Sequence, residues 1–477
     1  MQNTKLITIL STFNAREIKA FQSFVRSPYY NQNDRLIKLL SLIVPGPVWE
    51  PSTILNKQSL HLKLFPSLSF EDKRMRYLFT DLCRLAERFL LEQEYQANTL
   101  QQRLDLARIC NDRKLPKLYR QTIQKLEAYF EQQPAHDLDY FEKHLEFALI
   151  KDTHFQQQRI RKFDENLQWV ADDLDRYYYL QKLRHACVML DRQAIVTANY
   201  DLAISKNWLN HLVSHSFFNE PLIQLYYTIL MSSLEADEVQ HFQDLKEILV
   251  TTSNQINNKD LADIYRFAIN YCARKIRNGR NEYLEEALGL YIRGIESAVF
   301  LEDEYLSPWT FTNVVKLALR LQRFEWIAEF IPKYAPSLPP DFQENVLHYN
   351  YAELYFYTKD YDRALTHLNQ VAFDDLNYSL GARVMLAKIY QERGEENALL
   401  SLLAAFSVFL KRNRHISANI KHTYLNFCDL LFQLIRRSPK KIQGIRNRIE
   451  ETNLLTDRGW LLALCTQIEK DLALSSA

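Results

Sequence analysis

Glycine is scarce in this chain, with 8 residues in 477, against about 7% of residues in average proteins. None lies between Gly46 and Gly279. Phosphate-binding loops and tight turns with positive φ use glycine. The sequence therefore argues against a β-sandwich, a dinucleotide-binding domain or a P-loop domain in that span. The remaining composition is rich in Leu, Gln, Glu, Lys, Arg and Ala, which favour helices, and it predicts an all-α fold.

The chain also lacks a charge excess, a cysteine motif and a long apolar run. Its formal net charge is +1, so no overall field attracts nucleic acid or an anionic membrane. The six cysteines are widely separated, which predicts small buried side chains in a reducing compartment rather than a disulfide framework. The most apolar run, residues 400–410, is about half the ~20 residues that span a bilayer. The first residues do not resemble a signal peptide, so we expect a cytoplasmic protein without membrane contact.

Motifs for catalysis or metal binding are missing from the sequence. There is no phosphate loop and no GxSxG. His211 and His215 can share a helix face, but Leu212 follows His211 and no glutamate lies between the two histidines, so the HExxH pattern fails. Carboxylates cluster near Asp173 and Glu285, where a solvated helix face is the simplest interpretation. We expect a non-catalytic protein with no cofactor, no bound metal and no small-molecule substrate.

Four segments follow one another along the chain. Residues 1–95 are predicted to form a helical N-terminal unit, which has capping-box spacing at Asn14 and Glu17. Irregular helical hairpins are expected over 96–270, where a long helix at 163–192 has one apolar face that includes Leu167 and Leu174. Repeated hairpins follow over 271–410. C-terminal helices with a basic stretch occupy 411–477.

The segment "YFYTKDYDRALTHL", residues 355–368, predicts a helical hairpin. Its first helix ends near Thr358, Lys359 and Asp360 form the turn, and the second helix starts at Tyr361. Similar patterns place the starts of second helices at three other residues, Tyr283, Phe324 and Glu396. The four starts are separated by 41, 37 and 35 residues.

This pattern resembles the tetratricopeptide repeat, a helix–turn–helix unit of about 34 residues. The family places aromatic and small residues at set positions, and four residues match them: Tyr355, Asp360, Tyr361 and Ala364. The family's usual Trp and terminal Pro are replaced here by His348 and Leu376. The resemblance, over about residues 270–410, implies a divergent α-solenoid of antiparallel helical hairpins, with an irregular helical bundle as the alternative. The chain as a whole is similar to long helical-repeat proteins of the Bacteroidota, a likeness that implies no activity.

The resemblance also implies a partner-binding groove on the concave face, which is lined by the first helix of each hairpin. The family's groove positions fall on Trp309, Thr312, Lys316, Tyr349, Glu353, Phe356, Lys388 and Gln391. The family's lysine and asparagine clamp for a terminal carboxylate looks absent, since only Lys316 is basic among the matching positions. The resemblance thus predicts a scaffold or adaptor that binds a protein or peptide in a mixed aromatic groove. Alternatively, half of these residues pack against the next helix.

A basic stretch near the C-terminus offers a second prediction. Its members are Lys411, Arg412, Arg414, Lys421, Arg436, Arg437, Lys440, Lys441, Arg446 and Arg448. Asp429 is the only acidic residue among them. Such a density of cations can neutralise phosphates, which makes a regulatory protein that binds nucleic acid or another polyanion the alternative function. Cations that decorate helix C-termini are the simpler interpretation.

Overall fold

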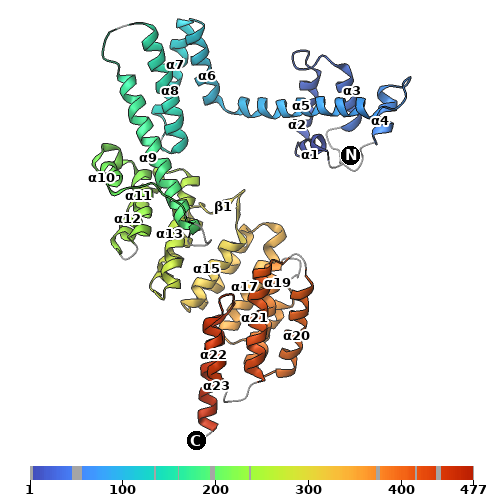
Figure 1. Ribbon diagram of the computed structural model, residues 1–477, viewed down its shortest axis with the longest axis vertical. Helices are drawn as coiled ribbons and strands as arrows, with labels where there is room; N and C mark the ends of the chain where they lie inside the picture. The colour runs from blue at the N-terminus through green and yellow to red at the C-terminus, as the bar shows by residue number, and fades with distance from the viewer. Residues whose placement is uncertain are drawn as a thin grey trace. The chain divides into compact units, whose positions relative to one another are not determined.

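The computed structural model is helical almost throughout (Figure 1). It describes residues 4–45, 56–133, 136–159, 161–193, 199–235, 238–371, 376–413, 416–436 and 442–475. These residues contain 23 α-helices and one sheet of two short antiparallel strands, so the all-α prediction is confirmed. None of the helices in the described ranges is both long enough and apolar enough to cross a membrane.

The chain divides into two compact units, Met1–Tyr178 and Tyr179–Ala477. The division falls inside helix α9. The helices of the first unit are α1 (Lys5–Leu10), α2 (Ala15–Arg26), α3 (Asp34–Ile43), α4 (Lys57–Leu64), α5 (Asp72–Ala97), α6 (Thr99–Asp112), α7 (Pro116–Glu131), α8 (Leu138–Gln157) and the start of α9 (Glu165–Gln193).

The first unit has two apolar cores. One is shared by α1 to α5 and includes the fully buried Phe21 and the buried Phe89. The other lies among α6, α7 and α8, around Leu126 and Phe147. The predicted capping box is confirmed, because the Asn14 side chain accepts from the Glu17 amide and the Glu17 carboxylate accepts from the Asn14 amide.

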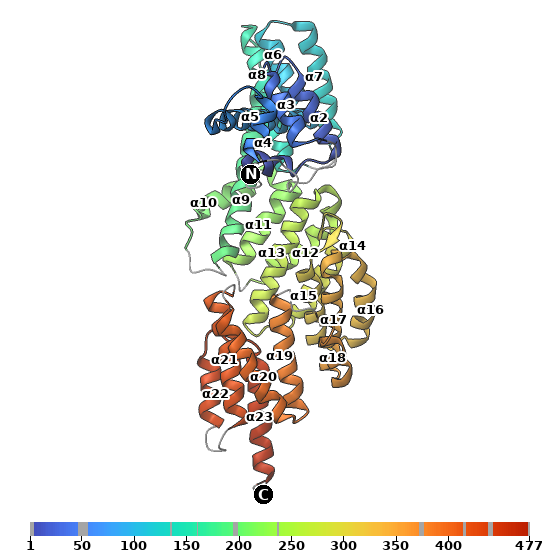
Figure 2. The ribbon, with the colours of Figure 1, turned by 90° about the vertical axis from the view of Figure 1, so that its right-hand side faces the viewer.

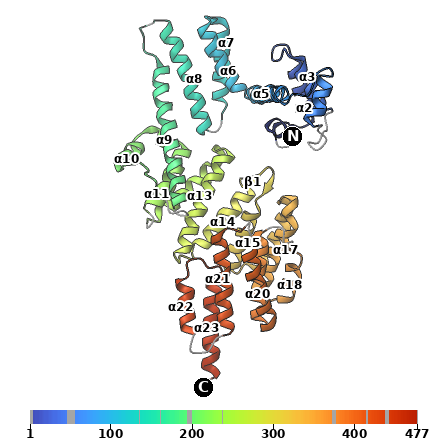
Figure 3. The same ribbon diagram turned by 45° about the vertical axis from the view of Figure 1, so that its right-hand side comes forward.

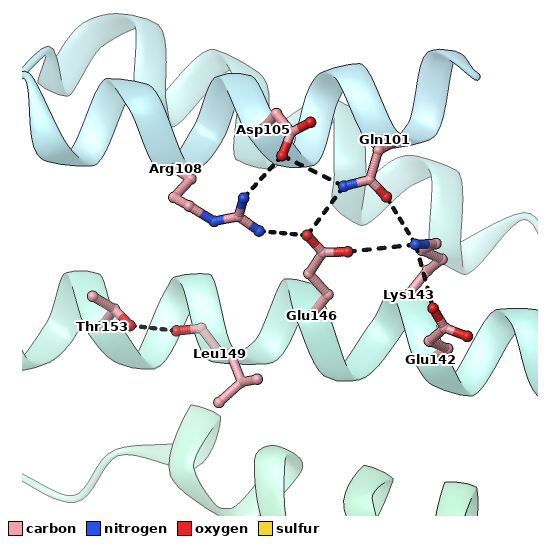
Figure 4. A network of polar contacts seen from close by, with 8 residues as sticks. All are labelled: Gln101, Asp105, Arg108, Glu142, Lys143, Glu146, Leu149 and Thr153. Carbon is pink, nitrogen blue, oxygen red and sulfur yellow. Dashed lines mark hydrogen bonds and ion pairs between the residues drawn. The ribbon is translucent and has the colours of Figure 1, made fainter. Parts of the chain in front are cut away.

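Helices α6 and α8 are joined by a network of polar side chains (Figure 4). Arg108 bridges the carboxylates of Asp105 and Glu146, and Gln101 donates to both of them. Lys143 donates to the Gln101 carbonyl oxygen at 2.8 Å. The network holds the two helices in register at the edge of the second core, so these charges have a structural role.

The second unit contains the remaining helices and the strand pair. These are α10 (Lys206–Ser214), α11 (Pro221–Leu234), α12 (Gln240–Thr252), α13 (Asn258–Arg277), α14 (Tyr283–Glu296), β1 (Leu301–Glu302), β2 (Tyr305–Leu306), α15 (Pro308–Arg320), α16 (Phe324–Tyr334), α17 (Pro340–Tyr357), α18 (Tyr361–Leu368), α19 (Leu376–Glu392), α20 (Glu396–Arg412), α21 (Ala418–Ile435), α22 (Ile442–Glu451) and α23 (Arg458–Ser475). The strand pair was not expected from the sequence.

Consecutive helices of the second unit pack as pairs. Helix α13 packs on α14, α17 on α18, and α19 on α20 (Figure 2). Contacts also join helices two apart in sequence, since α17 touches α15 (Figure 3) and also touches α19. One apolar core runs from α14 to α19 and a second from α19 to α23.

The four predicted starts of second helices are confirmed. Helices α14, α16, α18 and α20 begin at Tyr283, Phe324, Tyr361 and Glu396. The predicted end of the preceding helix is confirmed as well, because α17 ends at Tyr357 and Thr358 is its C-cap. Three of the starts are aromatic residues, and the fourth, Glu396, follows the turn at Gly394, so local sequence was sufficient to place them.

A common turn connects the two helices of several pairs. Before α18, Lys359 has a φ of 61°, and the Asp360 amide donates to the Tyr355 carbonyl at 2.9 Å. This is the Schellman arrangement that ends a helix with one left-handed residue. The same left-handed conformation, followed by the same type of hydrogen bond, occurs before α7, α16 and α20, at Lys114, Gln322 and Gly394. The α6–α7 pair in the first unit therefore uses the same turn as the pairs of the second unit.

The predicted apolar face of α9 is buried in the second half of the helix, at Leu180, Leu183 and Ala186, whereas the first half differs from the prediction. The sequence placed Leu167 and Leu174 on a buried face and Asp173 on a solvated one. In the structure, those leucines are 58% and 52% exposed, whereas Asp173 is 4% exposed. The Asp173 carboxylate is paired with His144, at 2.5 Å from Nδ1, and with Arg176, so a polar contact sets the orientation of this part of the helix.

Candidate functional site

Five of the eight predicted groove residues meet at one cavity of about 340 Å³ in the second unit. They are Lys316 of α15, Tyr349, Glu353 and Phe356 of α17, and Lys388 of α19. The three helices contact one another in the order α15, α17, α19, so equivalent positions on successive first helices come together. Tyr424 of α21 and Asp457, just before α23, complete the wall.

The other three predicted groove residues lie away from this cavity. Thr312 is buried at 5% exposure, and its hydroxyl is hydrogen-bonded to the amide of Asn350 at 3.3 Å. Trp309 is 57% exposed and stacks beside Tyr378. Gln391 is half-buried near the end of α19. Thr312 thus packs inside the helix layer, as the alternative interpretation of these positions had it.

The side chain of Lys388 is held in place by three neighbouring side chains. Its ammonium group donates to the Asp457 carboxylate at 2.8 Å and lies 4.7 Å from the centre of the Phe356 ring and 5.8 Å from that of Trp460. The side chain is only 12% exposed. A cation between aromatic faces and a carboxylate is already neutralised, so Lys388 connects α19 to the turn before α23.

Glu353 lies deeper in the cavity and is poorly satisfied. Its side chain is 12% exposed, and the closest cation, Lys316, is 4.0 Å from Oε1. Among the described residues, no group donates a hydrogen bond to Oε2. Burial raises the pKa of this carboxyl above its ordinary value, against the opposing effects of Lys316, Lys388 and the nearby Tyr349 hydroxyl. Oε2 is therefore a buried acceptor without a donor among the described residues, on a side chain that lines the cavity.

Tyr349 lies one helical turn before Glu353 and is buried. Burial raises the pKa of its phenol well above the ordinary value, and the Glu353 carboxylate raises it further, so the hydroxyl stays protonated. Gly381 of α19 makes room for this ring, because a Cβ at that position would lie 2.6 Å from the Tyr349 hydroxyl oxygen. The close approach of α17 and α19 at this point is possible because glycine has no side chain.

The mouth of the cavity is more exposed and positively charged. Lys316 has 52% of its side chain exposed, and Arg320 follows one turn later on α15. Tyr357, which is 47% exposed, stands beside them. The cavity therefore combines cations at its opening with an unsatisfied carboxylate oxygen at depth and aromatic rings between.

A pair of histidines links α17 to α18 outside this cavity. The Nδ1 atoms of His348 and His367 are 2.9 Å apart, so one ring donates to the other. Tyr351 and Tyr355 stack on the His367 ring. Burial lowers the pKa of both histidines, and the nearness of His348 lowers that of His367 further.

We expect this pair to make stability depend on pH. In the unfolded chain, histidine titrates near pH 6.5, and its pKa is lower in the folded protein, so the unfolded state takes up protons first as the pH falls. The stabilisation is complete above about pH 6.5 and is lost below it, by roughly 1 kcal/mol for the shared hydrogen bond. Urea unfolding from pH 8 to pH 5 would measure it.

The matched test compares variants of the pair with a variant of an exposed histidine. Replacement of both His348 and His367 by glutamine should flatten the decrease in stability below pH 6.5. Replacement of the exposed His422 of α21 by glutamine should leave the decrease unchanged. An equal decrease in the double variant and the wild type would show that other groups are responsible.

The described members of the basic stretch do not gather at one place. Lys411 and Arg412 are exposed in the last turn of α20, and Arg436 is the exposed C-cap of α21. The two helices pack together and are consecutive, so these residues lie at opposite ends of a helix of about 27 Å. Lys421 lies in the first turns of α21.

The last two arginines of the stretch are already paired. Arg446 donates to the carboxylate of Glu469 at 2.8 Å, and Arg448 donates to that of Asp429 at 3.2 Å. The remaining members, Arg414, Arg437, Lys440 and Lys441, lie outside the described residues.

The cysteines are buried and free, as the sequence predicted. Burial raises the pKa of Cys272 and of Cys428 to about 12, so these thiols stay protonated and unreactive. Within the described ranges, no group of three or more His, Cys, Asp or Glu side chains is arranged to hold a metal ion.

The cavity residues beyond the first helices were missed by the sequence interpretation. Tyr424 comes from α21, and Thr456 and Asp457 come from the segment between α22 and α23, which the repeat pattern does not cover. Comparisons of the chain with protein-family models, with curated proteins and with solved structures give no match.

Proposed function

We propose that this protein is a non-catalytic scaffold or adaptor, and that it binds a peptide or a segment of another protein at the cavity between α15, α17 and α19. The proposal rests on a single observation. Side chains at equivalent positions of three successive first helices line one cavity. Its lining includes an exposed cation, Lys316, and Glu353, whose Oε2 has no donor among the described residues.

We propose further that the second unit is a divergent α-solenoid similar to tetratricopeptide arrays. Three features support this: the shared turn before α16, α18 and α20, the packing of consecutive helices as pairs, and the contacts of α17 with both α15 and α19. In such an array, each hairpin buries its apolar face only against its neighbours, and the first helices form one continuous surface. The cavity lies on that surface.

The cavity is a better candidate than the part of the basic stretch that the structure describes. Binding of a polyanion requires several unpaired cations on one face. Arg446 and Arg448 are paired with carboxylates, and Lys411 and Arg412 lie far from Arg436 along the α20–α21 pair. The cavity, in contrast, gathers its polar groups within about one turn of three neighbouring helices.

A selection of peptides on the full chain tests the proposal. Peptides that bind the wild-type protein would be selected from a random displayed library. Calorimetry would then measure the affinity of the selected peptides for the wild type and for two variants. Lys316→Glu and Tyr357→Ala change exposed side chains at the mouth, so they should weaken binding about 10-fold or more without a change in melting temperature.

The matched control reverses two charges in the basic stretch instead of at the cavity. Lys411→Glu with Arg412→Glu alters exposed cations at the end of α20, and we expect it to leave peptide affinity unchanged. Loss of binding in this control and not in Lys316→Glu, together with a steep dependence on salt, would transfer the function to the basic stretch. Failure to enrich any peptide would contradict the proposal.

A further inference from the structure

The unsatisfied oxygen of Glu353 indicates that the cavity lacks a hydrogen-bond donor. Oε2 is buried and accepts no hydrogen bond from the described residues, and the residue that carries it lines a cavity of about 340 Å³. A buried acceptor without a donor costs about 1–3 kcal/mol, and more for a charged group. A ligand that brings an N–H donor to this atom recovers that free energy.

The cations already present cannot supply this donor. Lys388 is engaged with Asp457 and with the faces of two aromatic rings. Lys316 reaches only Oε1, at 4.0 Å, and half of its side chain is in solvent. An ion pair of this length at a surface contributes little, so an incoming cation can replace Lys316 as the partner of Glu353.

The walls of the cavity suit a long basic side chain. Phe356, Tyr357 and Tyr424 line it. The methylene groups of a lysine or arginine pack on aromatic surfaces, while the charged end is attracted to the faces of the rings. The nearby Lys388 already makes such a contact with Phe356. The volume is at the lower end of that of small ligand pockets, which is enough for one side chain.

We infer that the cavity accepts a lysine or arginine side chain of a peptide, whose charged end donates to the Glu353 carboxylate, and that an acidic residue next to it in the peptide contacts Lys316 and Arg320 at the mouth. The charges of the ligand are then complementary to those of the cavity. The positive group of the ligand meets the Glu353 carboxylate at depth, and its negative group meets the cations at the mouth. This inference rests on the proposed function, since it names the chemistry of the peptide that the cavity binds.

Pools of acetylated and amidated hexapeptides provide the test, because blocked ends contribute no charge. In each pool, one position is fixed and the others are random, and binding to the full chain is measured by surface plasmon resonance. Pools with a fixed lysine or arginine should bind at least about 10-fold more tightly than pools with fixed glutamine or leucine, as expected for one hydrogen bond to a charged group.

Three variants distinguish Glu353 from its surroundings. Glu353→Gln has the same shape and should abolish the preference for basic pools, whereas Glu353→Asp keeps the charge and should retain most of it. Lys316→Glu should reverse the preference at the flanking position, from acidic to basic residues. Melting temperatures of all three would establish that each variant is folded.

The outcomes separate this inference from the proposed function. If pools bind the wild type, and lose affinity on Tyr357→Ala, but show no preference for lysine or arginine, the inference is wrong and the peptide-binding function stands. If Glu353→Gln keeps the preference, the inference is also wrong. If no pool binds above background, both fail.

Discussion

Replacement of Ala364 by glutamate should lower the free energy of unfolding of the second unit by about 3 kcal/mol or more. Ala364 lies in α18, is fully buried, and belongs to the core that runs from α14 to α19. The larger side chain has no space there, and its carboxylate would lose its hydration without a partner. Overpacking alone costs about 1–3 kcal/mol, and burial of the charge adds to it.

The control places the same residue on the other side of the same helix. Thr366 is exposed in α18, so Thr366→Glu should change stability by less than about 0.5 kcal/mol. Urea unfolding followed by circular dichroism would compare both variants with the wild type. Equal stability of Ala364→Glu and Thr366→Glu would mean that α18 does not pack on α17 through this face.

The helix starts of the second unit could be predicted because they depend on local sequence. Tyr361 follows a helix end, a left-handed residue and a capping residue, Asp360, whose side chain accepts from the Arg363 amide. All of this information lies within a few residues. The same is true of the capping box at Asn14. Such features require no knowledge of what the helix packs against.

The scarcity of glycine was a weaker guide than expected. Nine described residues other than glycine have a left-handed backbone, and several of them end helices. Lys114 is one, and it forms the same turn before α7 that Gly394 forms before α20. Because lysine carries no signal for a turn, the α6–α7 hairpin could not be identified from its turn residue. Pro116 at the start of α7 was the available hint.

The buried face of the first half of α9 could not be read from periodicity, because a tertiary contact overrides it there, whereas the second half buries Leu180 and Leu183 as predicted. The apolar pattern favoured Leu167 and Leu174 as buried residues, but the structure buries Asp173 against His144 of α8. His144 is 29 residues away in sequence. A buried carboxylate is acceptable only when paired, and no pattern within α9 reveals the partner.

For the candidate cavity, too, the sequence predicted the residues that share a helix face but not the partners that are distant in sequence. The family resemblance placed Lys316, Glu353 and Lys388 on comparable helix faces, and the structure brings them together. It could not supply Asp457, which is 69 residues from its partner Lys388. Nor could it show that Thr312, one turn before Lys316, is buried in the helix layer. Spacing along one helix indicates a shared face but not what covers it.

Two glycine-to-alanine substitutions should have opposite effects on stability. In a helix, alanine is favoured over glycine by about 1 kcal/mol. At Gly289 of α14, an added Cβ meets no atom within 4 Å, so Gly289→Ala should stabilise the second unit by about that amount. At Gly381, the Cβ would lie 2.6 Å from the Tyr349 hydroxyl and 3.0 Å from a ring carbon. The overpacking costs about 1–3 kcal/mol and outweighs the gain.

We therefore expect Gly381→Ala to destabilise the second unit and to be about 2 kcal/mol less stable than Gly289→Ala, as measured by urea unfolding. Tyr349 cannot easily move away, because its ring is buried and packs edge-on against Tyr378 at 5.2 Å. Adding Tyr349→Phe removes the closest atom and should restore part of the loss. If Gly381→Ala stabilises as much as Gly289→Ala, then α17 and α19 do not approach each other here, and the cavity that depends on their approach would lose its wall.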